Sequence, residues 1–281
     1  MSEIYTRINN NVNNNDFIPE IVFIIPYRDR EEHKHFFQRQ MDYLMEDVSK
    51  QTYKIYFIHQ KDDRSFNRGA MKNIGFLAMC KKYPNDYKNI IFVFHDVDTL
   101  PYKKNIIDYK TTPGIVKHYY GYTFALGGIF SIMGSDFEKT GGFPNFWAWG
   151  GEDNIIQKRV QKCGLYIDRS SFFQIGNRNI LQFADGFLKT INRNELGTIE
   201  QDNSYEYYNT IKNIQYSFNN EYIDVISFDT NISYDFVKNN FESHNISKGN
   251  NRIRLKKKRQ TSKSFGSLYG LHNKQKISIF K

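Results

Sequence analysis

Residues 90–98 read IIFVFHDVD, a short apolar run followed at once by two aspartates separated by one residue. A continuous apolar run of this length is typical of a strand that is buried on both faces. Two similar runs precede it, at 21–25 and 55–58, and residues 68–82 have the apolar spacing of a helix. Strands that alternate with helices predict an α/β fold around a mixed, mostly parallel sheet flanked by helices.

Further elements are expected on both sides of this region. A polar loop at 27–32 leads into a helix that ends near Met45. Downstream we expect a strand at 126–133, a helix at 152–163 and a late strand at 221–228. No linker clearly divides these elements, so we expect three parts: a disordered Asn-rich leader (1–18), one domain (19–235) and a basic extension (236–281).

The net charge of +9 belongs to the C-terminal segment rather than to the body of the chain. No acidic residue follows Glu242, whereas eleven basic residues do, which leaves 28 basic and 30 acidic residues in the rest. A basic segment of this kind has a weak affinity for polyanions or for an acidic membrane surface. Because no nucleic-acid-binding motif accompanies it, we expect no specific nucleic-acid partner.

Neither membrane insertion nor secretion is indicated. No apolar run approaches the roughly 20 residues that span a bilayer, so we expect no transmembrane segment. The first residues, MSEIYTRINNNVNNND, lack the apolar core of a secretory signal. Two cysteines, Cys80 and Cys163, are too few for a disulfide framework. We therefore expect a soluble protein of the cytoplasm or an equivalent reducing compartment.

The two aspartates of the opening stretch, Asp96 and Asp98, are the first candidate site. Residues two apart in an extended chain point to the same side, and open α/β sheets bind ligands at the carboxyl ends of their strands. Two carboxylates there suit Mn²⁺ or Mg²⁺ held against a diphosphate. A polar exit from a strand explains the same tripeptide, so the motif alone leaves both interpretations open.

The second candidate site is the stretch WAWGGED at 147–153. Two tryptophans beside a Gly-Gly pair suggest a mobile loop that presents flat apolar faces to a sugar. Glu152 and Asp153 open a helix, whose dipole keeps carboxylates ionised, as a general base must be. Helix capping and core packing account for the same residues.

The third candidate group is basic and aromatic, with PYRDR at 26–30 and FNR at 66–68. Arginines that follow sheet strands clamp phosphate groups, and an aromatic ring stacks on a base. Arginines in surface loops are the plain alternative.

These motifs occur in an order that resembles the β-1,4-galactosyltransferase family (glycosyltransferase family 7). The stretches are PYRDREEH (26–33), FNRGAMKNIGF (66–76), FVFHDVD (92–98), LGG (126–128) and GGFPNFWAWGGEDN (141–154). The resemblance runs from about Ile21 to about Asp229, and its last part lies in the stretch NTIKNIQYSFNNEYIDVISFDT (209–230). It implies the GT-A fold, a UDP-sugar donor, Mn²⁺ (with Mg²⁺ as the alternative), a DxD motif and sugar transfer with inversion.

The resemblance also implies residue roles. Asp98 matches the metal-ligating aspartate, and Asp153 matches the catalytic base that takes the proton of the acceptor hydroxyl. Trp149 matches the tryptophan of a loop that closes over the donor. The full donor-binding set is Pro26, Arg28, Arg30, Phe66, Arg68, Asp96, Val97, Asp98, Trp149 and Glu152. The acceptor and specificity positions are Tyr122, Ala125, Gly127, Gly128, Asp153 and Asn154.

Three positions differ from the family pattern. The family completes its metal site with a histidine after WGGED, but no histidine occurs between His118 and His244. Counting without gaps puts Asn179 and Gln182 at the later ligand positions, with Asp185 close by, so Gln182 and Asp185 are the candidates for a further ligand. Ala125 replaces an aromatic residue that limits the donor, which leaves room for an N-acetyl group, and Asn154 replaces an acid of the acceptor site.

We therefore expect an inverting glycosyltransferase that transfers a galactose-like hexose from a UDP-sugar to a hydroxyl of a glycan or glycoconjugate acceptor. Three alternatives stay open. One is an N-acetylhexosaminyltransferase that uses UDP-GalNAc or UDP-GlcNAc. Another is a non-catalytic relative that binds UDP or a sugar. The third is a polyanion-binding protein that works through residues 248–281.

Overall fold

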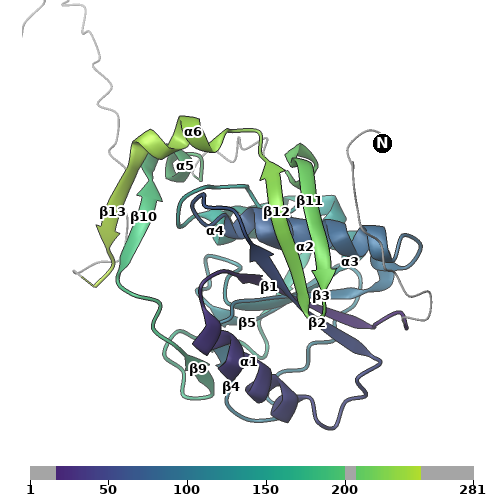
Figure 1. The fold of residues 1–281 in the computed structure, drawn as a ribbon. Helices are drawn as coiled ribbons and strands as arrows, with labels where there is room; N and C mark the ends of the chain where they lie inside the picture. Colours follow the sequence, from purple (N-terminus) through teal and green to yellow (C-terminus); the bar gives the residue numbers. More distant parts are fainter. Residues whose placement is uncertain (1–16, 200–206, 248–281) are drawn as a thin grey trace, which may run out of the picture. The chain divides into compact units, whose positions relative to one another are not determined.

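The structure is a computed structural model that describes residues 17–199 and 207–247 (Figure 1). Most of the predicted leader (1–18) and of the predicted basic extension (236–281) lies outside the described residues. The disorder predicted for the leader and the polyanion affinity predicted for residues 248–281 therefore stay predictions.

Strands and helices alternate along the first half of the chain, as the sequence predicts. The strands are β1 (Ile21–Tyr27), β2 (Tyr53–Gln60), β3 (Ile91–His95), β4 (Thr99–Pro101), β5 (Ile115–Gly121), β6 (Ile129–Met133), β7 (Tyr166–Asp168), β8 (Phe173–Gln174), β9 (Ile180–Gln182), β10 (Leu188–Asn192), β11 (Lys212–Asn219), β12 (Tyr222–Asp229) and β13 (Phe241–Asn245). The helices are α1 (Glu31–Leu44), α2 (Arg68–Lys82), α3 (Gly134–Thr140), α4 (Glu152–Lys162), α5 (Arg193–Gly197) and α6 (Tyr234–Val237). Short 3₁₀ turns lie at Tyr87–Asn89, Tyr208–Thr210 and Lys238–Asn240.

The main sheet has the strand order β11-β12-β2-β1-β3-β6-β5-β7, and β8 also pairs with β5. Its central strands β12, β2, β1 and β3 are parallel to one another. The pairings β3–β6, β6–β5 and β11–β12 are antiparallel. The prediction of a mixed, mostly parallel sheet is therefore confirmed.

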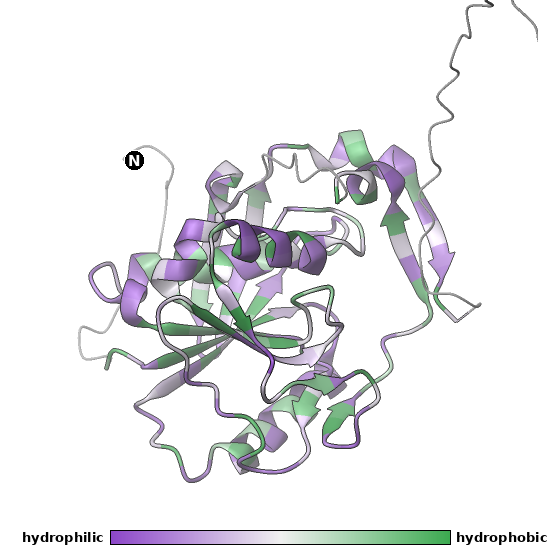
Figure 2. Cartoon of the chain, turned by 180° about the vertical axis from the view of Figure 1, so that it is seen from behind, coloured by the Kyte–Doolittle hydropathy of each residue, from purple (hydrophilic) through white to green (hydrophobic). Residues whose placement is uncertain are grey.

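The sheet is buried on both faces, which explains the continuous apolar runs of its central strands. Val22 and Ile24 of β1 pack in one buried cluster together with residues of α2. Phe23 and Ile25 point to the other face, where they pack with α1. Figure 1 shows α1 and α2 on opposite sides of the strands, and Figure 2 shows that the central strands are largely hydrophobic.

The predicted elements occur with shifts of a few residues at their ends. The helix expected at 68–82 is α2, and the helices expected near 33–45 and at 152–163 are α1 and α4. The strand expected at 126–133 begins only at Ile129, because the backbone turns at Gly128, where φ is +69°.

Two small sheets lie beside the main one. In the first, β4 pairs with β9, which places the segment after Asp98 against residues 180–182. In the second, β10 pairs with β13, and β13 lies inside the stretch that was predicted to be a basic extension. Within the described ranges no helix has both the length and the apolar character needed to cross a bilayer.

Candidate active site

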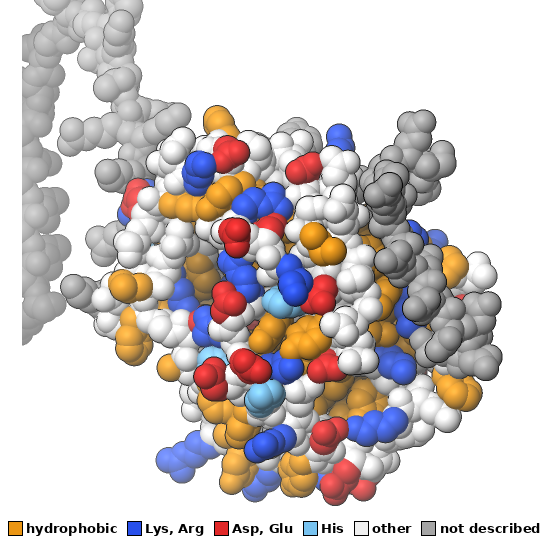
Figure 3. Space-filling view, viewed as in Figure 1, with side chains coloured by type: hydrophobic (Ala, Val, Ile, Leu, Met, Phe, Trp, Pro, Cys, Tyr) orange, Lys and Arg blue, Asp and Glu red, His pale blue; other side chains and the backbone are white. Residues whose placement is uncertain are grey.

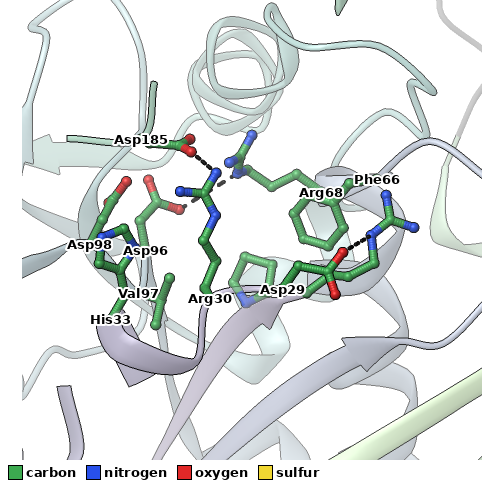
Figure 4. Close-up of a pocket in the computed structure, with 11 residues that line it drawn as sticks. Asp29, Arg30, His33, Phe66, Arg68, Asp96, Val97, Asp98 and Asp185 are labelled. Carbon is green, nitrogen blue, oxygen red and sulfur yellow. Dashed lines mark ion pairs between the residues drawn. The ribbon is translucent and has the colours of Figure 1, made fainter. Parts of the chain in front are cut away.

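A pocket of about 310 Å³ lies where β1 and β3 end (Figure 4). Because these strands are parallel neighbours, the residues that follow them meet at one edge of the sheet. Its lining residues are Pro26, Arg28, Asp29, Arg30, His33, Phe66, Arg68, Asp96, Val97, Asp98 and Asp185. The predicted donor-binding residues from 26–30, 66–68 and 96–98 thus line one pocket.

The arginines of the pocket are held by protein groups. Arg28 Nη1 donates hydrogen bonds to the carbonyl oxygens of Asp62 (3.2 Å) and Arg64 (2.5 Å). The guanidinium groups of Arg28 and Arg68 each lie 5.5 Å from the centre of the Phe66 ring. Fixed arginines lose little conformational entropy when they bind a phosphate.

Asp98 is the carboxylate of this pocket that most needs a cation. Burial and the negative charge of Asp96 raise its pKa, whereas Arg68, His33 and Arg30 oppose that shift. A divalent cation would relieve the same penalty, since a carboxylate is a preferred ligand of Mn²⁺ and Mg²⁺. The pocket therefore fits a metal at Asp98.

His33 also lines the pocket, and it was not among the residues predicted from the sequence. It projects from α1 beside Asp98 (Figure 4), and its ring stacks on Phe183 with the centres 5.6 Å apart. Its Nδ1 atom is buried and has no hydrogen-bond partner within the described part of the chain. The stretch PYRDREEH contains this histidine, but the family resemblance places the metal-ligating histidine downstream of WGGED.

The two predicted further ligands, Asp185 and Gln182, are engaged elsewhere. Asp185 lines the pocket, but its carboxylate pairs with Arg30 and with Lys189, whose Nζ lies 2.7 Å away. Gln182 lies close to Asp98 because β4 pairs with β9, and its Oε1 accepts a hydrogen bond from the Tyr120 hydroxyl at 2.6 Å. Among residues 17–199 and 207–247, no three His, Cys, Asp or Glu side chains are grouped to hold a metal ion by themselves.

The predicted base and the predicted donor-sugar contact begin helix α4, and α2 faces them with two cations. Arg68 Nη1 lies 3.5 Å from Glu152 Oε1, and its Nε lies 4.0 Å from Asp96 Oδ1. Lys72 Nζ lies 3.4 Å from Asp153 Oδ1 and 3.6 Å from Asp96 Oδ1. The acids of WAWGGED are thereby joined to the first aspartate of the DVD motif.

The two linked carboxylates differ in their proton affinity. Burial would raise the pKa of Asp96, but the charges of Lys72 and Arg68 outweigh burial and lower it. Burial raises the pKa of Asp153 to about 7, with Glu152 and Asp96 adding to the rise and Lys72 opposing it. A carboxyl group that titrates near neutral pH suits a general base.

The Gly127-Gly128 turn lies against the predicted base. A Cβ atom on Gly127 would lie 2.5 Å from Asp153 Oδ2. The backbone N–H of Leu126 donates to the carbonyl oxygen of Asp153 at 2.9 Å. Both glycines were assigned to acceptor binding and specificity, and Gly127 lies directly beside the acid that would receive the acceptor proton, whereas Gly128 packs against Tyr120.

The remaining acceptor and specificity positions lie on the same turn and on α4. Tyr122 and Phe124 stack with ring centres 5.0 Å apart, and they are 48% and 62% exposed. Asn154 Nδ2 donates to the carbonyl oxygen of Phe124 at 3.2 Å. Ala125, in contrast, is buried. This exposed aromatic pair lies on the turn whose backbone contacts Asp153 and Asn154, and a sugar ring can pack on such a surface.

The tryptophans of WAWGGED have different environments, which corrects the interpretation that both belong to a mobile loop. Trp147 is 1% exposed, stacks on Phe228 with ring centres 5.3 Å apart, and donates its indole N–H to the carbonyl oxygen of Ile232 at 3.0 Å. Trp149 is only partly buried, and its backbone N–H donates to the carbonyl oxygen of Thr190 at 2.7 Å. Trp147 therefore belongs to the core, and Trp149 is the tryptophan that is available to a ligand.

The charges of this face are balanced rather than of one sign. Figure 3 shows basic and acidic side chains interspersed on the face that it draws. The face drawn there therefore shows no extended patch of a single charge.

The fold is that of the GT-A glycosyltransferases. The catalytic domain of Drosophila β1,4-galactosyltransferase 7, solved with xylobiose, superposes with a TM-score of 0.58 at 18% identity, over 79% of this chain and 98% of that chain. A mutant of the same enzyme, solved with manganese, UDP-Gal and xylobiose, gives the same TM-score at 17% identity and the same coverage.

The chain itself belongs to glycosyltransferase family 7. Residues 13–110 match the family described as the N-terminal region of glycosyl transferase group 7, and residues 115–182 match the one described as the N-terminal domain of galactosyltransferase. Human β-1,4-galactosyltransferase 4 is 31% identical over 166 residues, which are 54% of this chain and 45% of that protein. Mouse β-1,4-galactosyltransferase 1 is 34% identical over 161 residues, 53% of this chain and 39% of that protein. The chain thus matches less than half the length of these relatives.

Proposed function

We propose that this chain is an inverting glycosyltransferase that transfers a galactose-like hexose from a UDP-sugar to a hydroxyl of a sugar acceptor. The observation that carries the proposal is the link between two sites. A pocket of arginines and aspartates, suited to a diphosphate, is joined through Asp96 and Lys72 to Asp153. The relatives named as β-1,4-galactosyltransferases, and the structural neighbour solved with UDP-Gal, support this choice.

The donor would occupy the pocket with its diphosphate between the arginines and Asp98. Arg30 and Arg68 present guanidinium groups, which bind phosphate oxygens in pairs. Phe66 offers a ring for the nucleotide, and Asp96 with Glu152 lies on the side of the donor sugar. Trp149, partly exposed, would cover the bound donor.

The metal of this site would be Mn²⁺ or Mg²⁺. Asp98 would hold it, with His33 as the further protein ligand, because its buried Nδ1 has no partner within the described part of the chain. When bound, the cation neutralises negative charge on the diphosphate and so favours its departure.

Asp153 would act as the general base of the transfer. It accepts the proton of the acceptor hydroxyl while that oxygen forms a bond to the anomeric carbon of the donor sugar. The bond from this carbon to the diphosphate oxygen breaks, and UDP leaves with the electron pair. Attack on the face opposite to UDP inverts the configuration. Arg30 and Arg68 stabilise the charge that develops on the departing diphosphate.

A donor with an N-acetyl group is the second candidate, and Ala125 favours it. Its side chain is small and buried, and it lies two residues before the Gly127-Gly128 turn. A small residue at this position leaves more room beside the sugar than an aromatic one. Turnover of UDP-Gal, UDP-GalNAc and UDP-GlcNAc, measured side by side, decides between the two donors.

The proposal is tested with that donor panel, Mn²⁺ or Mg²⁺, and acceptors that end in xylose, glucose or N-acetylglucosamine. We expect product with at least one donor, and Asp153→Asn should lower turnover roughly 10²–10⁴-fold while the affinity for UDP is kept. UDP binding in calorimetry without product from any donor would identify a non-catalytic binder instead.

We also propose that residues 248–281, which lie outside the described residues, bind polyanions or an acidic membrane surface. Their eight lysine and three arginine side chains with no acid support this. Removal of these residues should abolish retention on heparin at low salt and leave sugar transfer unchanged. If removal of these residues also abolished sugar transfer, that result would favour a function that resides in residues 248–281.

A further inference from the structure

Lys72 is the most deeply buried charged group of the site, with its side chain 1% exposed. It lies in the second turn of α2, and its ammonium group is 4.8 Å from the centre of the Phe143 ring. Its Nζ atom lies 3.4 Å from Asp153 Oδ1 and 3.6 Å from Asp96 Oδ1. A lysine is almost never buried to this degree unless it is paired, so these two carboxylates account for its position.

The packing of α2 against the segment before α4 determines which acid each cation of α2 contacts. Arg68 and Lys72 are four residues apart, so they lie on the same face of the helix. A Cβ atom on Gly69 would lie 1.9 Å from the carbonyl oxygen of Pro144, which shows how closely α2 is docked against the segment before α4. Arg68 therefore meets Glu152, and Lys72 meets Asp153.

We propose that Lys72 is a positioning residue, which holds the donor-side carboxylate of Asp96 and the base Asp153 as one unit and stabilises the ionised form of the base. The inference rests on the proposed function, because it takes Asp153 as the base. Lys72 stays protonated throughout: the proton of the acceptor hydroxyl goes to Asp153, and no proton passes through the lysine. By bridging the two acids, Lys72 sets the distance between the donor sugar and the acceptor hydroxyl.

The charges around Asp153 predict what the loss of Lys72 would do. Glu152 on the same helix and Asp96 after β3 disfavour ionisation of Asp153, and burial does so as well. Arg68 and Lys72 of α2 favour ionisation. Without Lys72, Arg68 remains as the opposing cation, and it is also close to Glu152 and Asp96. The pKa of Asp153 should then rise.

The test compares Lys72→Met and Lys72→Arg with the unchanged chain, by kcat and KM over pH 5–9. For Lys72→Met we expect kcat at pH 7 to fall about 10-fold or more, and the midpoint of the acidic limb to move up by about one pH unit or more. The KM for the UDP-sugar should change little. Lys72→Arg should keep the original midpoint, because it keeps the charge, while kcat falls with the altered geometry.

A matched control is Lys34→Met. Lys34 is also buried and also faces an acid, since its Nζ lies 3.8 Å from Glu221, but it does not line the pocket. This variant should keep the original pH profile. An unchanged midpoint and unchanged kcat in Lys72→Met would overturn the proposal, and so would an equal shift in Lys34→Met.

A second measurement needs no transfer activity. The side-chain carboxyl ¹³C resonance of Asp153, assigned by its loss in Asp153→Asn, is titrated in the unchanged chain and in both Lys72 variants. If the unchanged chain makes no product but Lys72→Met raises the pKa of Asp153, the proposed transferase function is wrong, whereas Lys72 does stabilise the ionised form of Asp153. If the unchanged chain makes product but Lys72→Met does not raise this pKa, the transferase function is right and the proposed role of Lys72 is wrong. If Lys72→Met does not fold, Lys72→Gln takes its place.

Discussion

The backbone N–H of Asp96 donates a hydrogen bond to the carbonyl oxygen of Gly128, with a distance of 3.0 Å between nitrogen and oxygen. This bond continues the antiparallel pairing of β3 with β6 beyond His95 and Ile129. It attaches the first aspartate of the DVD motif to the Gly127-Gly128 turn, and that turn lies against Asp153. Backbone geometry therefore joins the donor side of the site to its base side.

Gly127→Ala should lower kcat by about 10-fold or more, because the added Cβ would lie 2.5 Å from Asp153 Oδ2 and displace the carboxylate. The melting temperature should fall much less than activity, since Gly127 does not have a positive φ. Gly197→Ala is the control, because nothing lies within 4 Å of its added Cβ. Equal kcat in both variants would mean that the carboxylate adjusts freely.

The transfer rate should depend on pH with a midpoint near 7. Burial raises the pKa of Asp153 to about 7, so the group is protonated below that value and unable to accept the acceptor proton. The rate therefore rises with pH through about 7. For this group alone the effect on stability has the opposite sign. The folded state holds the proton more tightly than the unfolded one, so the contribution to stability falls as pH rises from about 4 to about 7. A rate that is flat from pH 5 to 9 would contradict this role of Asp153.

Substitutions of the two tryptophans of WAWGGED should have different effects, one on stability and the other on activity. Trp147→Ala should cost about 3–5 kcal/mol of the free energy of unfolding, because it removes a buried ring that packs on Phe228. Trp149→Ala should leave the free energy of unfolding within about 1 kcal/mol and raise the KM for the UDP-sugar. Urea denaturation and steady-state kinetics measure the two effects. The reverse pattern would show that the partly exposed ring has no part in donor binding.

Much of this site was predictable because its residues follow buried strands directly. Apolar runs marked the ends of β1 and β3, and the edge at which parallel strands end places Arg28, Arg30, Asp96 and Asp98 together. His33 and Lys72 were missed for a different reason. Each lies on a helix, and whether it faces the pocket, the core or solvent depends on how that helix packs on the sheet.

Strand β5 shows a second limit of sequence patterns. Its run IVKHYYG is interrupted by Lys117 and His118, so it does not read as a buried strand. His118 is nevertheless buried, because its Nε2 lies within hydrogen-bond distance of the carbonyl oxygens of Tyr120 and Gly127. Burial and the nearby charge of Arg169 lower the pKa of this imidazole to about 4, and its hydrogen bonds to the two carbonyl oxygens only partly oppose that shift. A polar residue satisfied by the backbone is invisible to a hydropathy pattern.

Phe124→Ala should raise the KM for the acceptor about 5-fold or more and leave the KM for the UDP-sugar unchanged. The exposed ring stacks on Tyr122, on the turn whose backbone contacts Asp153, so its loss removes apolar surface on which a sugar ring would pack. Tyr166→Ala is a suitable control, since this ring is 66% exposed on β7 and does not line the pocket. An equal rise of both KM values in Phe124→Ala would place the ring outside acceptor binding.

The dependence of UDP binding on metal should reside in Asp98 and His33 rather than in Asp185. Asp98→Asn should abolish the gain in UDP affinity that Mn²⁺ provides, and His33→Ala should reduce that gain about 10-fold. Asp185→Asn should keep the gain, because its carboxylate is already neutralised by Arg30 and Lys189. Calorimetric titration of UDP with and without Mn²⁺ measures this difference for each variant. Loss of the gain in Asp185→Asn with no effect in His33→Ala would assign the further ligand to the β9–β10 segment instead. The affinity for UDP without metal serves as the internal control, since in all three variants it should stay within a few-fold of that of the unchanged chain.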